Sequence, residues 1–305
     1  MNSAIPFPGA FLQPSLCRPA SSVSRGLRSW LPGHLQLLLL AALALPAQAA
    51  QTSSVPVTIR ADARLEPGLG TKPTLFLIGD STVHNRTRGQ SGWGDSLAEW
   101  LDLSKIALTN RALGGRSSRS FLNEGLWDKV LADLKPGDFV LMQFGHNDGG
   151  PLDDAKARAS LKGAGDESRV LTNKVSGKVE TVHTYGWYLR RYISDAKAKG
   201  ATPIVLSPVP RKIWKDGKVA RATRDYAEWA HEAAAAEGVA FVDLNDIVAL
   251  HYEELGPQKV EALFADEHTH TNPEGAKLNA RCVVEGLRAL KECPLSRYLV
   301  PEEGR

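Results

Sequence analysis

Five short apolar runs alternate with segments that have the spacing of amphipathic helices, and this alternation constrains the fold more than any other feature. The runs cover residues 74–78, 106–110, 139–144, 202–206 and 239–242. Strands that alternate with helices form a parallel sheet, because each crossover to the next parallel strand needs a helix-sized connection. The sequence therefore predicts an α/β fold with a doubly wound, five-stranded parallel sheet.

Helical spacing follows the apolar runs. The expected helices cover residues 93–103, 121–134, 181–199, 222–237, 245–255 and 273–291. Such helices can cover both faces of the sheet, which predicts a flavodoxin-like three-layer α/β/α architecture with the strand order 2-1-3-4-5. Residues 55–59 are expected to add an edge strand. The polar stretch from Gly149 to Glu180 predicts a long surface excursion, and loops of that length are usually functional or mobile.

The first 49 residues are typical of a secretory signal peptide. Basic residues precede an apolar run at 37–45, and Ala47-Gln48-Ala49 offers small residues for cleavage after Ala49. A membrane anchor is the alternative, but the run is too short to span a bilayer comfortably and Pro46 follows it. We therefore expect a secreted or periplasmic protein without a stable membrane anchor, in which residues 50–305 form a single domain.

The charge of the chain argues against nucleic acid as a partner. The whole sequence has 37 Lys and Arg against 34 Asp and Glu. The first 49 residues contain three arginines and no acid, so 34 basic and 34 acidic residues remain after cleavage. No basic excess is left to neutralise phosphates. We expect a monomer that binds no nucleic acid.

Two of the three cysteines remain once the leader is removed. Cys282 lies inside the last expected helix and Cys293 just beyond its end. An oxidising compartment permits a disulfide, but residues this far apart along a straight helix meet only if the chain folds back. The sequence leaves this pairing open. Neither cysteine belongs to a Cys-x-x-Cys motif, so no structural zinc is expected.

Chemically useful residues follow the expected strands at the edge where parallel strands end. Ser81 follows the first strand, Gly115 the second and Asn147 the third, while His270 precedes the last helix. Acyl transfer by a serine needs a base that contacts the hydroxyl, an acid that orients the base, and donors aimed at the developing oxyanion. A glycine N–H and an asparagine amide are suitable donors. This pattern favours a serine-dependent acyl transfer site.

Four sequence blocks carry a family resemblance. They are Gly79-Asp80-Ser81, Gly115, Gly145-His146-Asn147-Asp148 and Glu267-His268-Thr269-His270. Together they resemble the blocks of the SGNH (GDSL-type) hydrolases, over nearly the whole chain after the leader. Residues 110–120 and 268–276 are similar to the rhamnogalacturonan acetylesterase branch, whose members remove acetyl groups from pectic polysaccharide outside the cell.

The resemblance implies a role for each matching residue. Ser81 would be the nucleophile and His270 the general base. The oxyanion hole would consist of the N–H groups of Ser81 and Gly115 and the side-chain amide of Asn147. The reaction would pass through an acyl-enzyme and use no cofactor.

The acid of the site is the one departure from the family pattern. The family usually has an aspartate three residues before the histidine, whereas this chain has Glu267 there, with Asp266 beside it. Either Glu267 orients His270, or Asp266 reaches in from one residue further away. The spacing favours Glu267.

Other polar residues of these blocks have alternative interpretations. Asp80 could orient the base, but its place beside Ser81 favours a turn cap. His146 could be a second base, although a hydrogen bond to a neighbouring loop is the commoner role. His268 and His270 form a His-x-His pair of the kind that binds metal, but no further ligand cluster accompanies them, so no metal is expected.

Substrate contacts are expected from arginine and tryptophan. Arg116 and Arg119 match a uronate carboxylate with two donors each, or else pair with Asp and Glu in the fold. Trp214 follows the fourth strand in a charged loop and is favoured over Trp93 and Trp187 as a platform for a sugar ring. We therefore expect an esterase acting on acetylated pectic polysaccharide. Alternatives are an acetyl esterase acting on xylan or other small acetylated sugars, and a catalytically silent carbohydrate-binding protein.

Overall fold

The computed structural model describes residues 72–222 and 225–301, all within one compact unit of the chain (residues 63–305). The expected leader at residues 1–49 and the expected edge strand at residues 55–59 lie outside the described residues.

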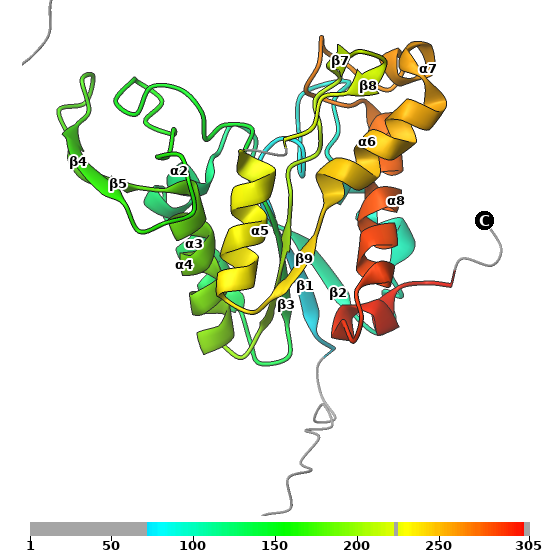
Figure 1. The fold of residues 1–305 in the computed structure, drawn as a ribbon. Helices are drawn as coiled ribbons and strands as arrows, with labels where there is room; N and C mark the ends of the chain where they lie inside the picture. The colour runs from blue at the N-terminus through cyan, green and yellow to red at the C-terminus, as the bar shows by residue number, and fades with distance from the viewer. Residues whose placement is uncertain (1–71, 223–224, 302–305) are drawn as a thin grey trace, which may run out of the picture. The chain divides into compact units, whose positions relative to one another are not determined.

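A central sheet of five parallel strands organises this unit (Figure 1). The strands are β1 (Thr74–Gly79), β2 (Ala107–Asn110), β3 (Phe139–Gln143), β6 (Thr202–Leu206) and β9 (Ala240–Val242). Their spatial order is β2-β1-β3-β6-β9, and every neighbouring pair is parallel. In chain order this is 2-1-3-4-5, which confirms the predicted fold.

Alternation along the strands divides the apolar core into two layers. In β1, Leu75 and Leu77 belong to one buried cluster and Phe76 and Ile78 to the other, so each face of the sheet is covered. The first cluster is completed by α1 (Trp93–Ser96), the 3-10 helix η1 (Leu97–Trp100), α6 (Leu244–Leu255), α7 (Pro257–Glu261), α8 (Pro273–Ala289) and η2 (Pro294–Tyr298). The second is completed by α2 (Ser118–Asn123), α3 (Leu126–Asp133), α4 (Tyr185–Ala198) and α5 (Tyr226–Ala236).

Three expected helices differ from those observed. The helix expected over 93–103 is a single α-helical turn followed by η1. The helix expected over 121–134 is split into α2 and α3 at Gly125, whose φ of 67° is left-handed and easily adopted by glycine. The helix expected from residue 181 begins later, at Tyr185, because the preceding residues pair as a β-strand.

The excursion after Gly149 is ordered around an antiparallel hairpin of β4 (Ser168–Thr172) and β5 (Val179–His183). A second short hairpin pairs β7 (Trp214–Lys215) with β8 (Lys218–Val219). Neither hairpin joins the central sheet (Figure 1). Both follow strands of that sheet at its carboxyl edge, where they can shape a site.

The two cysteines of the described residues do not form a disulfide. Cys282 is buried and Cys293 partly buried, and the two thiols are unpaired.

Over residues 72–222 and 225–301, no helix has the length and apolar character required to cross a membrane.

Close packing of α8 on β9 depends on Gly286. A Cβ at this position would lie 2.3 Å from Cγ1 of Val242. We expect Gly286→Val to lower the free energy of unfolding by about 3 kcal/mol, since overpacking a filled core strains its neighbours. Urea denaturation measures this. Arg281→Val, at an exposed position of the same helix, should cost less than about 1 kcal/mol, and equal losses in the two variants would refute the packing argument.

Candidate active site

Ser81 lies in a tight turn directly after β1. Only glycine fits at position 79, because a Cβ there would approach the carbonyl oxygen of Gln143 to 2.4 Å. The N–H groups of Val83 and His84 both donate to the carbonyl oxygen of Asp80, at 3.1 Å each, and close the turn. The turn therefore places Ser81 at the carboxyl edge of the sheet, as the sequence predicts.

A buried polar chain supports this turn from below. Oδ1 of Asp80 accepts hydrogen bonds from the N–H and the hydroxyl of Thr82, at 2.8 and 2.7 Å. The amide of Gln143 donates to the Thr82 hydroxyl, and its oxygen accepts from the indole N–H of Trp93 at 2.9 Å. Asp80 therefore caps the turn and makes no contact with the catalytic histidine candidate. Trp93 is fully buried and unavailable to a sugar.

The structure brings Ser81 and His270 together across 189 residues of sequence. Oγ of Ser81 lies 2.8 Å from Nε2 of His270, and Nδ1 of the same ring lies 2.5 Å from Oδ2 of Asp266. An ionised carboxylate can only accept, so Nδ1 carries a proton and donates it to Asp266. Nε2 is then left as the acceptor for the Ser81 hydroxyl.

Asp266, and not Glu267, holds the histidine. Oδ1 of Asp266 accepts the backbone N–H groups of His268, Thr269 and His270, at 3.2, 2.8 and 2.8 Å. These bonds fold the loop into a tight turn that directs the carboxylate inward. Glu267 is exposed. The spacing argument that favoured Glu267 was wrong, because the turn, rather than the count of residues, decides which carboxylate reaches the ring.

The same hydrogen bonds keep Asp266 ionised. Burial would raise the pKa of this carboxyl, but the backbone N–H groups of His270 and Thr269 and the His270 ring outweigh burial and lower the pKa to about 2. The site thus holds a fixed negative charge next to the imidazole. Within residues 72–222 and 225–301, no three or more His, Cys, Asp or Glu side chains form a group able to hold a metal ion.

Donors for an oxyanion converge beside Ser81. Among the described residues, the N–H groups of Ser81 and Gly115 make no hydrogen bond to protein groups. Gly115 has a φ of 78°, and a Cβ there would meet nothing within 4 Å, so its open side faces the cavity. The Asn147 amide donates one N–H to the carbonyl oxygen of Arg116 at 3.0 Å and keeps its second N–H. All three predicted oxyanion residues therefore meet at one place.

A cavity of about 620 Å³ opens over these groups. Its lining consists of Ser81, His84, Asn85, Arg86, Thr87, Gln90, Leu113, Gly114, Gly115, Asn147, Arg158 and His270. Arg86 and Arg158 are lining residues that the sequence motifs do not predict. Arg86 lies five residues after the Gly-Asp-Ser block, which is a usable signal, whereas nothing local marks Arg158 within the excursion.

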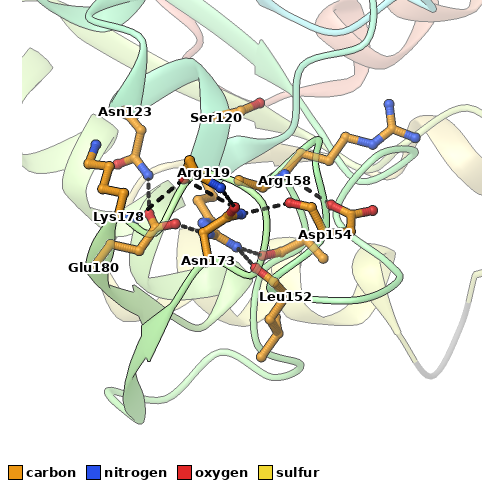
Figure 2. Close-up of polar contacts among 12 residues, drawn as sticks. Arg119, Ser120, Asn123, Leu152, Asp154, Arg158, Asn173, Lys178 and Glu180 are labelled. Atoms are coloured by element: carbon orange, nitrogen blue, oxygen red, sulfur yellow. Dashed lines mark hydrogen bonds and ion pairs between the residues drawn. The ribbon is translucent and has the colours of Figure 1, made fainter.

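The remaining predicted substrate contacts lie elsewhere. Arg116 bonds to Glu124 and to the carbonyl oxygen of Gly114 and is not part of the cavity lining. Arg119 is fully buried and pairs with Glu180 (Figure 2). Trp214 is partly buried and packs against the first apolar cluster. Arg116 and Arg119 thus take the alternative role that the sequence left open, as partners of a carboxylate within the fold, and burial removes Arg119 from substrate contact. The substrate role of Trp214 stays a prediction.

His146 is also no second base. It is partly buried, and desolvation lowers its pKa, an effect that the charge of Asp80 partly opposes. Ser81 contacts His270 instead. The neighbouring Asp148 is fully buried, and its Oδ1 accepts the hydroxyls of Ser118 and Ser160 at 2.5 and 3.2 Å. This link holds the loop that carries Asn147 against α2.

A serine, histidine and aspartate linked in this order, beside free N–H donors at the carboxyl edge of a parallel sheet, form the site of a serine hydrolase. Residues 77–278 match the family model described as the GDSL-like lipase/acylhydrolase family. The chain belongs to this family and is a carboxylic ester hydrolase.

Named relatives cover most of the chain. It is 35% identical over 207 residues to a rhamnogalacturonan acetylesterase of Emericella nidulans, over 68% of this chain and 81% of that protein. It is 32% identical to YesY of Bacillus subtilis, a probable rhamnogalacturonan acetylesterase, over 75% of this chain and 98% of that protein. The crystal structure of YxiM from Bacillus subtilis superposes with a TM-score of 0.58 at 27% identity, over 72% of this chain but only 56% of that one.

Asp148 should make stability depend on pH. Burial raises the pKa of Asp148 to about 7, although the hydrogen bonds from Ser118 and Ser160 oppose this effect. An aspartate in the unfolded chain has a pKa of ~3.9. Between about pH 4 and 7 the unfolded chain releases this proton and the folded chain keeps it, so its contribution to stability is lost as pH rises.

We therefore expect the unfolding free energy of the native protein to fall relative to Asp148→Asn, by at most ~1.4 kcal/mol per pH unit in that range. Parallel urea titrations of the two proteins measure the difference, in which the titration of other groups cancels. A difference that is flat, or that rises with pH, would contradict a raised pKa for Asp148.

Proposed function

We propose that the protein is a secreted serine esterase that removes O-acetyl groups from pectic polysaccharide, rhamnogalacturonan in particular, through an acyl-enzyme. One observation carries the proposal: the hydrogen-bonded chain from Ser81 through His270 to Asp266 opens into a cavity lined by two unpaired N–H donors. The named relatives support an acetylated carbohydrate as the substrate.

The first half-reaction acetylates the serine. Nε2 of His270 takes the hydroxyl proton of Ser81 as Oγ bonds to the acetyl carbonyl carbon. Charge then develops on the carbonyl oxygen, which the N–H groups of Ser81 and Gly115 and the free N–H of Asn147 stabilise. The bond to the sugar oxygen breaks, and His270 returns its proton to that oxygen, so the sugar leaves as an alcohol.

The second half-reaction restores the enzyme. His270 takes a proton from water, whose oxygen attacks the acetyl carbon of the acyl-enzyme. The same donors hold the new oxyanion, and acetate leaves as Ser81 Oγ recovers the proton. Asp266, fixed by three backbone N–H groups, stabilises the imidazolium in both halves and keeps the ring in the productive tautomer.

Secretion is proposed from the sequence of the leader. The apolar run at residues 37–45 and the small residues before Ala50 support export, and a polysaccharide substrate is met outside the cytoplasm.

Removing the nucleophile should abolish turnover. We expect Ser81→Ala to lower kcat on p-nitrophenyl acetate by about 10⁴-fold or more, because within the described part of the chain no other hydroxyl is held against Nε2 of His270. Spectrophotometric assay measures turnover, and circular dichroism should show an unchanged fold. Ser104→Ala, at an exposed serine whose hydroxyl donates to Asp102, should keep native activity. Turnover retained in Ser81→Ala would show that Ser81 is not the nucleophile.

The two neighbouring carboxylates should differ sharply. Asp266→Asn keeps an oxygen for the three backbone N–H groups but favours the wrong imidazole tautomer, so kcat should fall by about 10³- to 10⁴-fold. Glu267→Gln should change kcat by less than about threefold, because the side chain is exposed. A larger loss of kcat in Glu267→Gln than in Asp266→Asn would show that Glu267 is the acid that orients His270.

A further inference from the structure

We propose that Arg86 and Arg158 form an anion-recognition pair that binds the carboxylate of a uronic acid unit next to the ester. This inference rests on the proposed function and names the two residues that would distinguish its acidic substrate from a neutral acetylated sugar. Arg86 and Arg158 would thus bind the uronate carboxylate that the sequence suggested as a ligand of Arg116 and Arg119.

The charge of the cavity is the first observation. Its twelve lining residues include two arginines and no aspartate or glutamate. Asp95 and Asp266 lie behind the lining, bonded to His84 and His270, whereas the two guanidinium groups reach the cavity itself and give its open side a positive potential. A neutral sugar gains nothing from that potential, whereas a uronate does.

Availability of the two guanidinium groups is the second observation. Among the described residues neither Arg86 nor Arg158 forms an ion pair, while Arg111, Arg116, Arg119, Arg190, Arg191 and Arg221 each pair with a carboxylate. These six arginines are thus neutralised within the protein. The two that line the catalytic cavity keep their charge for a ligand.

Arg86 is held by its loop in a way that leaves its outer nitrogens free. Its Nε donates to Nε2 of His84 at 3.1 Å, and Nδ1 of His84 bonds to Asp95. The loop is closed by hydrogen bonds from Asn85 Nδ2 to Gln90 at 2.9 Å and from Thr87 N–H to Asn85 at 2.9 Å. Among residues 72–222 and 225–301, no hydrogen bond occupies the two terminal nitrogens of Arg86, so both remain for a carboxylate.

Arg158 is fixed next to the oxyanion loop. Its carbonyl oxygen accepts the hydroxyl of Ser117 at 2.5 Å, and its Nη1 donates to the carbonyl oxygen of Gly115 at 3.3 Å. The guanidinium thus bonds to the residue whose N–H serves the oxyanion. A carboxylate on it would lie beside the acetyl group that Ser81 attacks.

The buried arginine of α2 explains why Arg158 stays there. Nη1 of Arg119 donates to the carbonyl oxygens of Leu152 and Ala159, at 2.8 and 2.7 Å, and Nη2 pairs with Glu180 of β5. These contacts pin both ends of the excursion around Arg158, whose guanidinium extends away from this hub (Figure 2). Arg119 therefore supports the substrate contact from inside the fold.

Carboxylate recognition by arginine has the required chemistry. A guanidinium presents parallel N–H donors that match the two oxygens of a carboxylate, and such charge-assisted bonds are stronger than neutral ones. In a pectic substrate one uronate ring can carry both an acetyl ester and the carboxylate. The pair can therefore orient the same ring that reacts.

Substrate charge provides the test. kcat/KM is measured for native protein, Arg86→Gln, Arg158→Gln and the double variant on acetylated trigalacturonate, acetylated xylotriose and p-nitrophenyl acetate. We expect each single variant to lose about tenfold and the double variant about 100-fold on the galacturonate. Losses on the two neutral substrates should stay below about threefold. Arg88→Gln, an exposed arginine of the same loop outside the cavity lining, should leave all three values unchanged.

A separate binding measurement distinguishes failure of this inference from failure of the proposed function. Unacetylated trigalacturonate is titrated calorimetrically into Ser81→Ala with and without the two arginine substitutions. We expect binding that weakens with salt in the first protein and at least tenfold weaker binding in the second.

Each outcome decides one of the two proposals. Equal losses on acidic and neutral substrates, or equal trigalacturonate binding with and without the arginines, would overturn the anion-recognition pair. Arginine-dependent binding without turnover of either acetylated sugar would overturn the proposed function and leave the pair standing.

Discussion

Convergence of the carboxyl ends of parallel strands is the constraint on which the rest of this structure depends. β1, β2 and β3 run side by side in one direction, so the loops that follow them meet at one edge. Ser81, Gly115 and Asn147 come from these three loops, and His270 reaches them from the start of α8. The hydrogen bond between Ser81 and His270 spans 189 residues only because the sheet brings the loops together.

Buried polar groups hold the loops at the carboxyl edge of the sheet in place. Asp80, Thr82 and Gln143 tie the serine turn to β3, Asp148 ties the asparagine loop to α2, and Arg119 ties the excursion to α2. Each group costs free energy to bury and is stabilised by several hydrogen bonds. These hydrogen bonds favour one arrangement of the loops, although Oδ2 of Asp80 and Nε of Arg119 are buried without a partner among the described residues. The cavity, with its two uncompensated arginines, is formed by loops held in this way.

The sequence predicts the frame of the molecule well because strong local patterns determine it. Apolar runs such as that of β1 are buried whatever their surroundings, and strand order follows from the alternation of strands and helices. The strand-end argument likewise identifies Ser81, Gly115, Asn147 and His270, which the structure brings together. Tertiary contacts decide the rest. The residues of β5 resemble a helix start until they pair with β4, and the choice between Asp266 and Glu267 depends on a backbone turn. Arg119 and Arg158 differ in role because the excursion folds over one of them.

Covalent acetylation of Ser81 is the central claim, and rapid quenching followed by peptide mass spectrometry tests it most directly. The enzyme is mixed with an acetylated oligogalacturonide, quenched in acid before deacylation is complete, and digested. The account predicts that the peptide containing Ser81 gains the mass of one acetyl group, and that fragmentation places this group on the Ser81 hydroxyl. Turnover of the same substrate without acetyl on Ser81, or with acetyl on a different residue, would contradict it.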